Sequence, residues 1–128
     1  MRDQPSTWTD YRGRTWKVTT MRGRLKFKIP CHAALRAHVF HRDGYRCQRC
    51  GEPAVGVPAD YDGRSALLTD KLDGGGWRVA LILDHILTLK AGGRNVVENL
   101  QALCEQCNKS KQIEDKAAAA AAQGVVAA

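Results

Sequence analysis

Two pairs of cysteines offer the clearest chemistry in this sequence. They are Cys47-Gln-Arg-Cys50 and Cys104-Glu-Gln-Cys107, and each pair places two thiols on one tight turn. A single CxxC pair could equally be a redox pair, whereas four thiolates complete the tetrahedral coordination that Zn²⁺ prefers. Because both pairs occur in one chain, we predict that the four cysteines bind one structural zinc ion.

The fifth cysteine, Cys31, is expected to take no part in this site. An odd number of cysteines does not fit a disulfide framework, and the N-terminal residues do not resemble a secretion signal. No apolar run is long enough to span a bilayer. We therefore expect a soluble protein from a reducing, intracellular compartment.

Composition points to a small domain with a polyanionic partner. The chain has 128 residues, a formal net charge of +7 and a pI near 9.4, with only two Phe, three Tyr and three Trp. One domain with a limited apolar core is expected, and metal binding would then add folding free energy. The charge favours a nucleic acid, although a ribosomal or membrane-surface protein would also be basic.

The N-terminal segment mixes basic and aromatic residues, a composition that suits contact with phosphates and bases. We expect a solvated, partly disordered arm here rather than an ordered element, and either could contact DNA. A helix is predicted over residues 33–42, where Leu35, Val39 and Phe40 recur at helical spacing and should pack on the zinc unit. Four thiolates leave no place at zinc for the histidines of this segment. Those histidines are His32, His38 and His41.

Residues 52–78 are interpreted as an insertion, with a short helix expected near residues 65–71. An excursion of this length is usually functional or disordered. A strand is predicted over residues 77–83, where strand-forming side chains run directly into Asp84 and His85.

A second helix is predicted to begin near Cys104 and to include Asn108, Lys109 and Lys111. The alanine-rich residues 117–128 have high helix propensity but no amphipathic pattern. We expect them to extend this helix for a turn or two, and we assign them no function.

Several motifs, in this order along the chain, resemble the HNH endonuclease family. The matching segments are residues 42–51, 83–86, 92–93 and 99–111. Agreement of separate motifs in order is far more specific than any one of them. The resemblance implies an α+β fold, namely a small zinc-stabilised ββα-metal (His-Me finger) domain with flanking helices.

The resemblance also divides the chain into three parts. Residues 1–30 would be a basic N-terminal arm, residues 31–116 the HNH nuclease domain, and residues 117–128 an alanine-rich tail. The insertion at residues 52–78 has no counterpart in the motif pattern.

The activity implied by the resemblance is hydrolysis of DNA phosphodiester bonds to 5′-phosphate and 3′-hydroxyl ends. His85 would be the general base, since a neutral imidazole has a suitable pKa. Asn99 would support the loop that orients His85. Asp84 and Asn108 would hold a catalytic divalent ion, Mg²⁺ or Mn²⁺.

Asn108 departs from the commonest family pattern, which has a histidine at this position. The departure resembles the phage recombination endonuclease branch, which uses an Asp and this Asn as metal ligands. One carboxylate and one amide oxygen suit a hard cation such as Mg²⁺ or Mn²⁺. The substitution could instead mark an inactive enzyme, but Asp84 and His85 are both present.

Three basic residues are predicted to contact DNA phosphates, and each could equally be an ordinary solvated charge. They are Arg94, Lys109 and Lys111. The size and arrangement of the chain also resemble the stand-alone HNH proteins of tailed phages and prophages, some of which assist the terminase in genome packaging. We therefore expect a cytoplasmic phage or prophage protein in a bacterial host, with DNA as its partner and a terminase as a second candidate.

Two other functions stay open. A non-catalytic zinc-binding, nucleic-acid-binding module would need the thiols and the net charge but neither Asp84 nor His85. A thiol oxidoreductase would show reversible oxidation of Cys47 and Cys50 and would bind no zinc.

Overall fold

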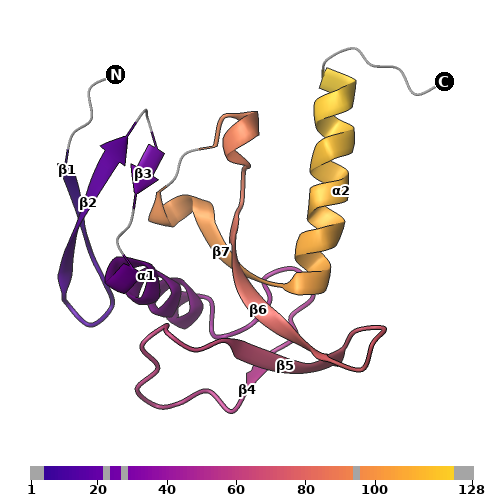
Figure 1. Cartoon of the computed structure of the whole chain (residues 1–128), viewed down its shortest axis with the longest axis horizontal. Helices are drawn as coiled ribbons and strands as arrows, with labels where there is room; N and C mark the ends of the chain where they lie inside the picture. The colour runs from indigo at the N-terminus through magenta and orange to yellow at the C-terminus, as the bar shows by residue number, and fades with distance from the viewer. Residues whose placement is uncertain (1–4, 22–23, 27–28, 94–95, 123–128) are drawn as a thin grey trace.

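The computed structural model describes residues 5–21, 24–26, 29–93 and 96–122. Within this part of the chain, two α-helices and two antiparallel sheets form an α+β fold (Figure 1), which confirms the predicted fold class. The strands are β1 (Pro5–Thr9), β2 (Thr15–Met21), β3 (Arg24–Lys26), β4 (Ala54–Val55), β5 (Leu67–Leu72), β6 (Arg78–His85) and β7 (Leu100–Cys104). The helices are α1 (Ile29–Arg42) and α2 (Glu105–Ala122), with short 3₁₀ turns η1 (Leu89–Ala91) and η2 (Val97–Asn99). Neither α-helix combines the length and the apolar character needed to cross a bilayer.

The first sheet, β1-β2-β3, lies in the segment that we expected to be a partly disordered arm, so that expectation is wrong for these residues. The β1–β2 turn is organised by Asp10. Its Oδ1 atom accepts hydrogen bonds from the amides of Arg12 and Arg14 at 3.0 and 2.9 Å, and its Oδ2 atom accepts one from Trp16 Nε1 at 2.8 Å. An aspartate that satisfies turn amides in this way favours a hairpin over an open chain.

Aromatic stacking attaches this sheet to α1. The rings of Tyr11 and His41 stack at 4.0 Å between centroids, and Trp8 meets His38 edge-on at 5.4 Å. Burial and the neighbouring Arg42 lower the pKa of His38. These two histidines therefore lie against aromatic side chains of β1 and of the β1–β2 turn.

Helix α1 begins four residues earlier than predicted, at Ile29, with Pro30 in its first turn. Proline is well tolerated there because the first helical amides have no partner inside the helix. The predicted apolar face is confirmed, since Leu35, Val39 and Phe40 are buried. The chain then reverses at Gly44, which adopts a left-handed conformation with φ +70°.

The second sheet has the order β4-β5-β6-β7 and incorporates part of the predicted insertion. The short helix expected at residues 65–71 is wrong, because β5 occupies this segment and pairs with β6. Leu67 and Thr69 are buried while Leu68 and Asp70 are exposed, the two-residue period of a strand. Thr69 is satisfied in the core by donating its hydroxyl to the carbonyl of Val79 at 2.7 Å.

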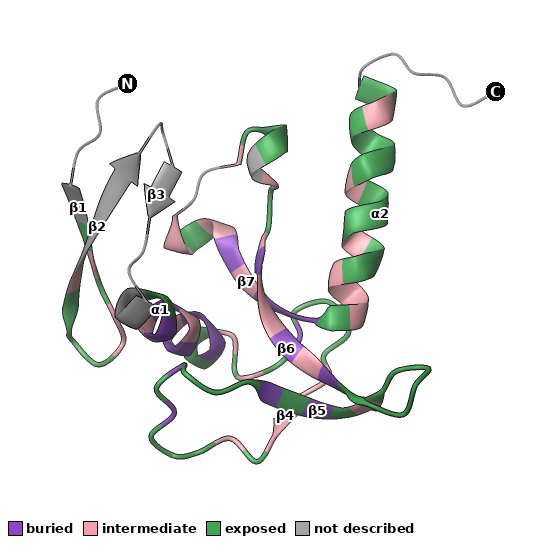
Figure 2. Ribbon diagram, viewed as in Figure 1, coloured by how far each residue is buried: buried purple, intermediate pink, exposed green. Residues whose placement is uncertain are grey.

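The core lies between α1 and the second sheet. Phe40, Val79 and Leu103 are almost completely buried there, in one cluster with Cys47 and Cys104. Figure 2 shows the buried segments on α1 and the strands, whereas α2 is exposed or half-buried along its length. Helix α2 contains no buried residue, so contacts other than apolar packing must hold it in place.

Truncation of the most buried aromatic residue tests this core. Phe40→Ala should lower the free energy of unfolding by about 3–5 kcal/mol, because it removes a fully buried ring and leaves a cavity. Urea unfolding with zinc present would measure the loss. The matched control is Trp77→Ala: this side chain is 76% exposed, so the change should stay within about 0.5 kcal/mol. Equal losses in the two variants would contradict the core described here.

Candidate functional site

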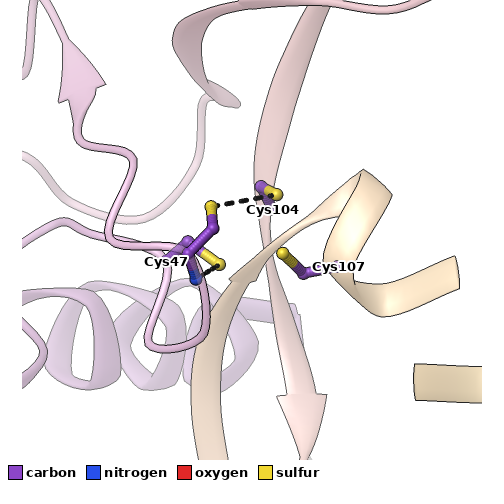
Figure 3. Close-up of side chains that lie close together, drawn as sticks. Cys47, Cys104 and Cys107 are labelled. Atoms are coloured by element: carbon purple, nitrogen blue, oxygen red, sulfur yellow. Dashed lines mark hydrogen bonds between the residues drawn. The ribbon is translucent and has the colours of Figure 1, made fainter. Parts of the chain in front are cut away.

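The four predicted zinc ligands converge between the loop after α1 and the start of α2. Their Sγ atoms all lie within 4.8 Å of one another, and those of Cys50 and Cys104 are 3.9 Å apart. Figure 3 shows the side chains of Cys47, Cys104 and Cys107 close together. A tetrahedral ion with metal–sulfur bonds of about 2.3 Å needs sulfur atoms about 3.8 Å apart. The donor set therefore fits one tetrahedral structural metal.

Backbone hydrogen bonds bring the first pair of thiols to the second. The Cys47 amide donates to Glu52, and the Gly51 amide donates to Cys47, which closes the tight turn. Gly51 has a φ of +79°, a conformation that other residues resist. The Gln48 amide donates to the carbonyl of Ala102 at 2.9 Å, which joins this turn to β7 beside Cys104.

Two of the thiols have pKa values shifted in opposite directions. Burial alone would raise the pKa of Cys47, but backbone hydrogen bonds from Cys50, Cys104 and Arg49 lower it to about 6. Burial and the neighbouring thiols raise the pKa of Cys107. The Cys47 thiol thus ionises readily, whereas ionisation of the Cys107 thiol is unfavourable. A bound dication would supply positive charge that stabilises both thiolates.

Lys71 supplies one positive charge that sequence reasoning missed. This residue lies on β5, and its Nζ atom is 3.3 Å from Cys50 Sγ and 3.7 Å from Cys104 Sγ. It belongs to the segment interpreted as an insertion. Only the pairing of β5 with β6 brings it to the cysteines, so no local motif could have identified it.

A second cluster forms where β6, β7 and the first turns of α2 meet. Asp84, near the end of β6, is only 9% exposed. Its Oδ1 atom accepts a hydrogen bond from Asn108 Nδ2 at 2.9 Å, and its Oδ2 atom accepts one from Gln101 Nε2 at 3.0 Å. The structure therefore brings together the two residues predicted to hold a catalytic metal. His85 follows Asp84 on the strand, so its side chain leaves the opposite face.

Asn99 fixes the backbone immediately after His85. Its side chain donates to the carbonyl of Leu87 and accepts from the amide of Leu87, both at 2.9 Å. Its own carbonyl accepts from the amide of Ile86 at 2.8 Å. These three hydrogen bonds hold the backbone that follows His85.

Two further residues of the motif segment, Arg42 and Asp43, join α1 to this region. The Arg42 guanidinium donates to the carbonyls of Val97 and Leu100, on either side of Asn99. Asp43 Oδ2 accepts from the amide of Ala102 at 2.9 Å. Sequence reasoning matched both residues to the motif but assigned them no contact.

The three predicted phosphate contacts have different surroundings. Arg94 lies outside the described residues, and Lys109 is exposed on α2. The side chain of Lys111 is only 14% exposed, and its Nζ atom donates to the carbonyl of His85 at 2.8 Å and to Asp115 Oδ2 at 3.0 Å. It also lies 3.4 Å from Asp84 Oδ2.

A family model described as HNH endonuclease matches residues 47–114, more than half of the chain. The chain belongs to the HNH endonuclease family. The matched part of this HNH protein begins at the first thiol and contains both clusters, with Asp84, His85, Asn99 and Asn108. Comparison with curated proteins and with solved structures gives no significant match. The family indicates a nuclease-type function with a divalent metal ion.

Removal of one thiol tests the metal centre. Cys104→Ser should reduce bound zinc well below one ion per chain and lower the free energy of unfolding by several kcal/mol, because metal binding contributes directly to folding in small domains. Atomic emission and urea unfolding would measure the two effects. The control Cys31→Ser should keep both values, and a Cys104→Ser variant with full zinc content would contradict the site.

Proposed function

We propose that this HNH protein is a metal-dependent DNA endonuclease that hydrolyses phosphodiester bonds to 5′-phosphate and 3′-hydroxyl ends. The observation that supports it best is the contact between Asp84 Oδ1 and Asn108 Nδ2 at 2.9 Å, with His85 next in sequence. Asp84 on β6 and Asn108 on α2 thus lie in contact, and His85 is the next residue of the same strand.

In this proposal, His85 takes the proton from the attacking water. A neutral imidazole is suited to this step near neutral pH. The contacts of Asn99 with Leu87 and Ile86 fix the backbone next to His85 and so limit the positions that its ring can adopt. Asn99 therefore acts as a positioning residue.

Asp84 and Asn108 are proposed to hold Mg²⁺ or Mn²⁺. The pair offers one carboxylate and, after the Asn108 amide turns about its last bond, one amide oxygen, which are donors that suit hard cations. When bound, such an ion stabilises charge on the scissile phosphate and on the leaving 3′-oxygen. The four thiols are proposed to hold the structural ion as Zn²⁺, which favours tetrahedral sulfur coordination.

DNA binding is proposed to use the positive charge of the chain. The net charge of +7 favours a polyanion, and Lys109 is exposed on the same helix as Asn108. Arg94, which lies outside the described residues, stays a predicted phosphate contact, and the basic N-terminal segment stays a predicted contact with DNA.

Substitution of the proposed base tests the activity. His85→Ala should lower Mg²⁺- or Mn²⁺-dependent cleavage of supercoiled plasmid by about 10²-fold or more, because it removes the proposed general base. Asp84→Asn should also abolish most of the activity. The control Asp70→Asn removes a carboxylate from the exposed face of β5 and should cleave normally. End mapping would identify the products.

The same experiment separates the proposal from its main alternative, a non-catalytic zinc module that binds nucleic acid. The endonuclease proposal requires that His85→Ala keep its zinc and its DNA affinity while it loses cleavage. A wild-type chain that binds DNA but cuts none of the supercoiled, linear or branched substrates would favour the alternative.

A place in phage or prophage DNA packaging, with a terminase as partner, is supported by the resemblance in size and motif order. Its test is co-purification of the tagged chain with terminase subunits, and a stable complex would be expected.

A further inference from the structure

Lys111 lies inside the candidate site although its neighbours on α2 face solvent. Lysine side chains usually extend their charge into water, and Lys109 is exposed in this way. The ammonium group of Lys111 instead lies among three oxygen atoms: the carbonyl of His85, Oδ2 of Asp115 and Oδ2 of Asp84. An ammonium held at 14% side-chain exposure by two carboxylates forms part of the site itself.

The two oxygen atoms of Asp84 have different partners as a result. Oδ2 is held by Gln101 Nε2 at 3.0 Å and lies 3.4 Å from Lys111 Nζ. Among the hydrogen bonds found for the described residues, Oδ1 accepts only from Asn108 Nδ2, whose own Oδ1 atom accepts from Gln112 Nε2 at 2.9 Å. The carboxylate is therefore fixed through one oxygen and presents the other toward Asn108, where the proposed metal would bind.

The charge of Lys111 opposes that metal. A positive charge in contact with Asp84 cancels part of the attraction that the carboxylate exerts on a dication, and it repels the dication directly. Asp115 offsets this effect from the other side of the ammonium, at 3.0 Å. A DNA phosphate entering the site would add negative charge and would restore the attraction for the ion.

We propose that Lys111 is a positioning residue that makes binding of the catalytic metal depend on DNA. Its ammonium orients Asp84 through Oδ2 and keeps the affinity for a free divalent ion low until a phosphate is present. The proposal rests on the proposed function, in which Asp84 and Asn108 are the metal ligands.

Titration of the zinc-loaded protein with Mn²⁺ tests the proposal without DNA cleavage, with free Mn²⁺ followed by electron paramagnetic resonance. Lys111→Met should bind Mn²⁺ more tightly in the absence of DNA, by on the order of tenfold, because the opposing charge is gone. Asp115→Asn should bind Mn²⁺ more weakly, because the charge of Lys111 is then less neutralised. A general loss of structure would shift both variants in the same direction.

The dependence on DNA is the second measurement. In a His85→Ala background, which prevents turnover, duplex DNA should tighten Mn²⁺ binding, and Lys111→Met should reduce this coupling severalfold. The charge-matched control is Lys116→Met, at an exposed position further along α2, which should change neither value. Lys109→Met should weaken DNA binding and reduce its salt dependence without altering the affinity for Mn²⁺ alone.

Two results would overturn the proposal. One is Mn²⁺ binding by Lys111→Met that is equal to or weaker than that of the parent. The other is a loss of DNA affinity and salt dependence like that of Lys109→Met, which would make Lys111 a phosphate contact. Failure of the proposed function is distinct: Asp84→Asn would then bind Mn²⁺ as well as the parent does, whatever Lys111→Met does.

Discussion

The convergence of four thiols is the constraint on which the rest of the structure depends. Helix α2 has no buried residue, so apolar packing cannot fix its position against the sheet. Cys107 lies in its first turn and Cys104 precedes it at the end of β7, within 4.8 Å of the thiols that follow α1. An ion pair between Arg49 and Glu114 at 2.7 Å adds a weaker connection, since both side chains are solvent-exposed. A metal at this point would therefore determine where α2 begins and in which direction it runs.

The second cluster depends directly on this geometry. Asn108 follows Cys107 in sequence, and Lys111 lies one turn further along the same helix, so both reach Asp84 only if α2 starts where the thiols place it. The two clusters also differ in the chemistry of their donors. Sulfur atoms suit a permanent structural ion, whereas a carboxylate and an amide next to an ammonium suit an exchangeable one. In this interpretation the permanently bound structural ion organises the site for a second ion, whose binding depends on DNA.

The sequence was most informative where a motif determines its own local geometry. The CxxC spacing, the strand that leads into Asp84 and His85, and the apolar face of α1 were all predicted, and the structure contains each of them. Prediction failed where strand pairing decides the outcome. The strands of the first sheet and β5 are short and include polar or charged residues, and their hydrogen-bonded partners complete them as strands. Lys71 was missed, and Lys111 was predicted only as a phosphate contact, because long-range pairing or helix placement determines which groups their ammonium ions contact.

The most direct test of this account is anomalous diffraction from crystals of the zinc-loaded protein soaked in Mn²⁺ together with a short DNA duplex. Data collected at the zinc and manganese absorption edges would distinguish the two ions. The account predicts a zinc peak among Cys47, Cys50, Cys104 and Cys107 and a separate manganese peak between Asp84 and Asn108. A manganese peak that contacts neither residue, with zinc in place and DNA bound, would contradict it.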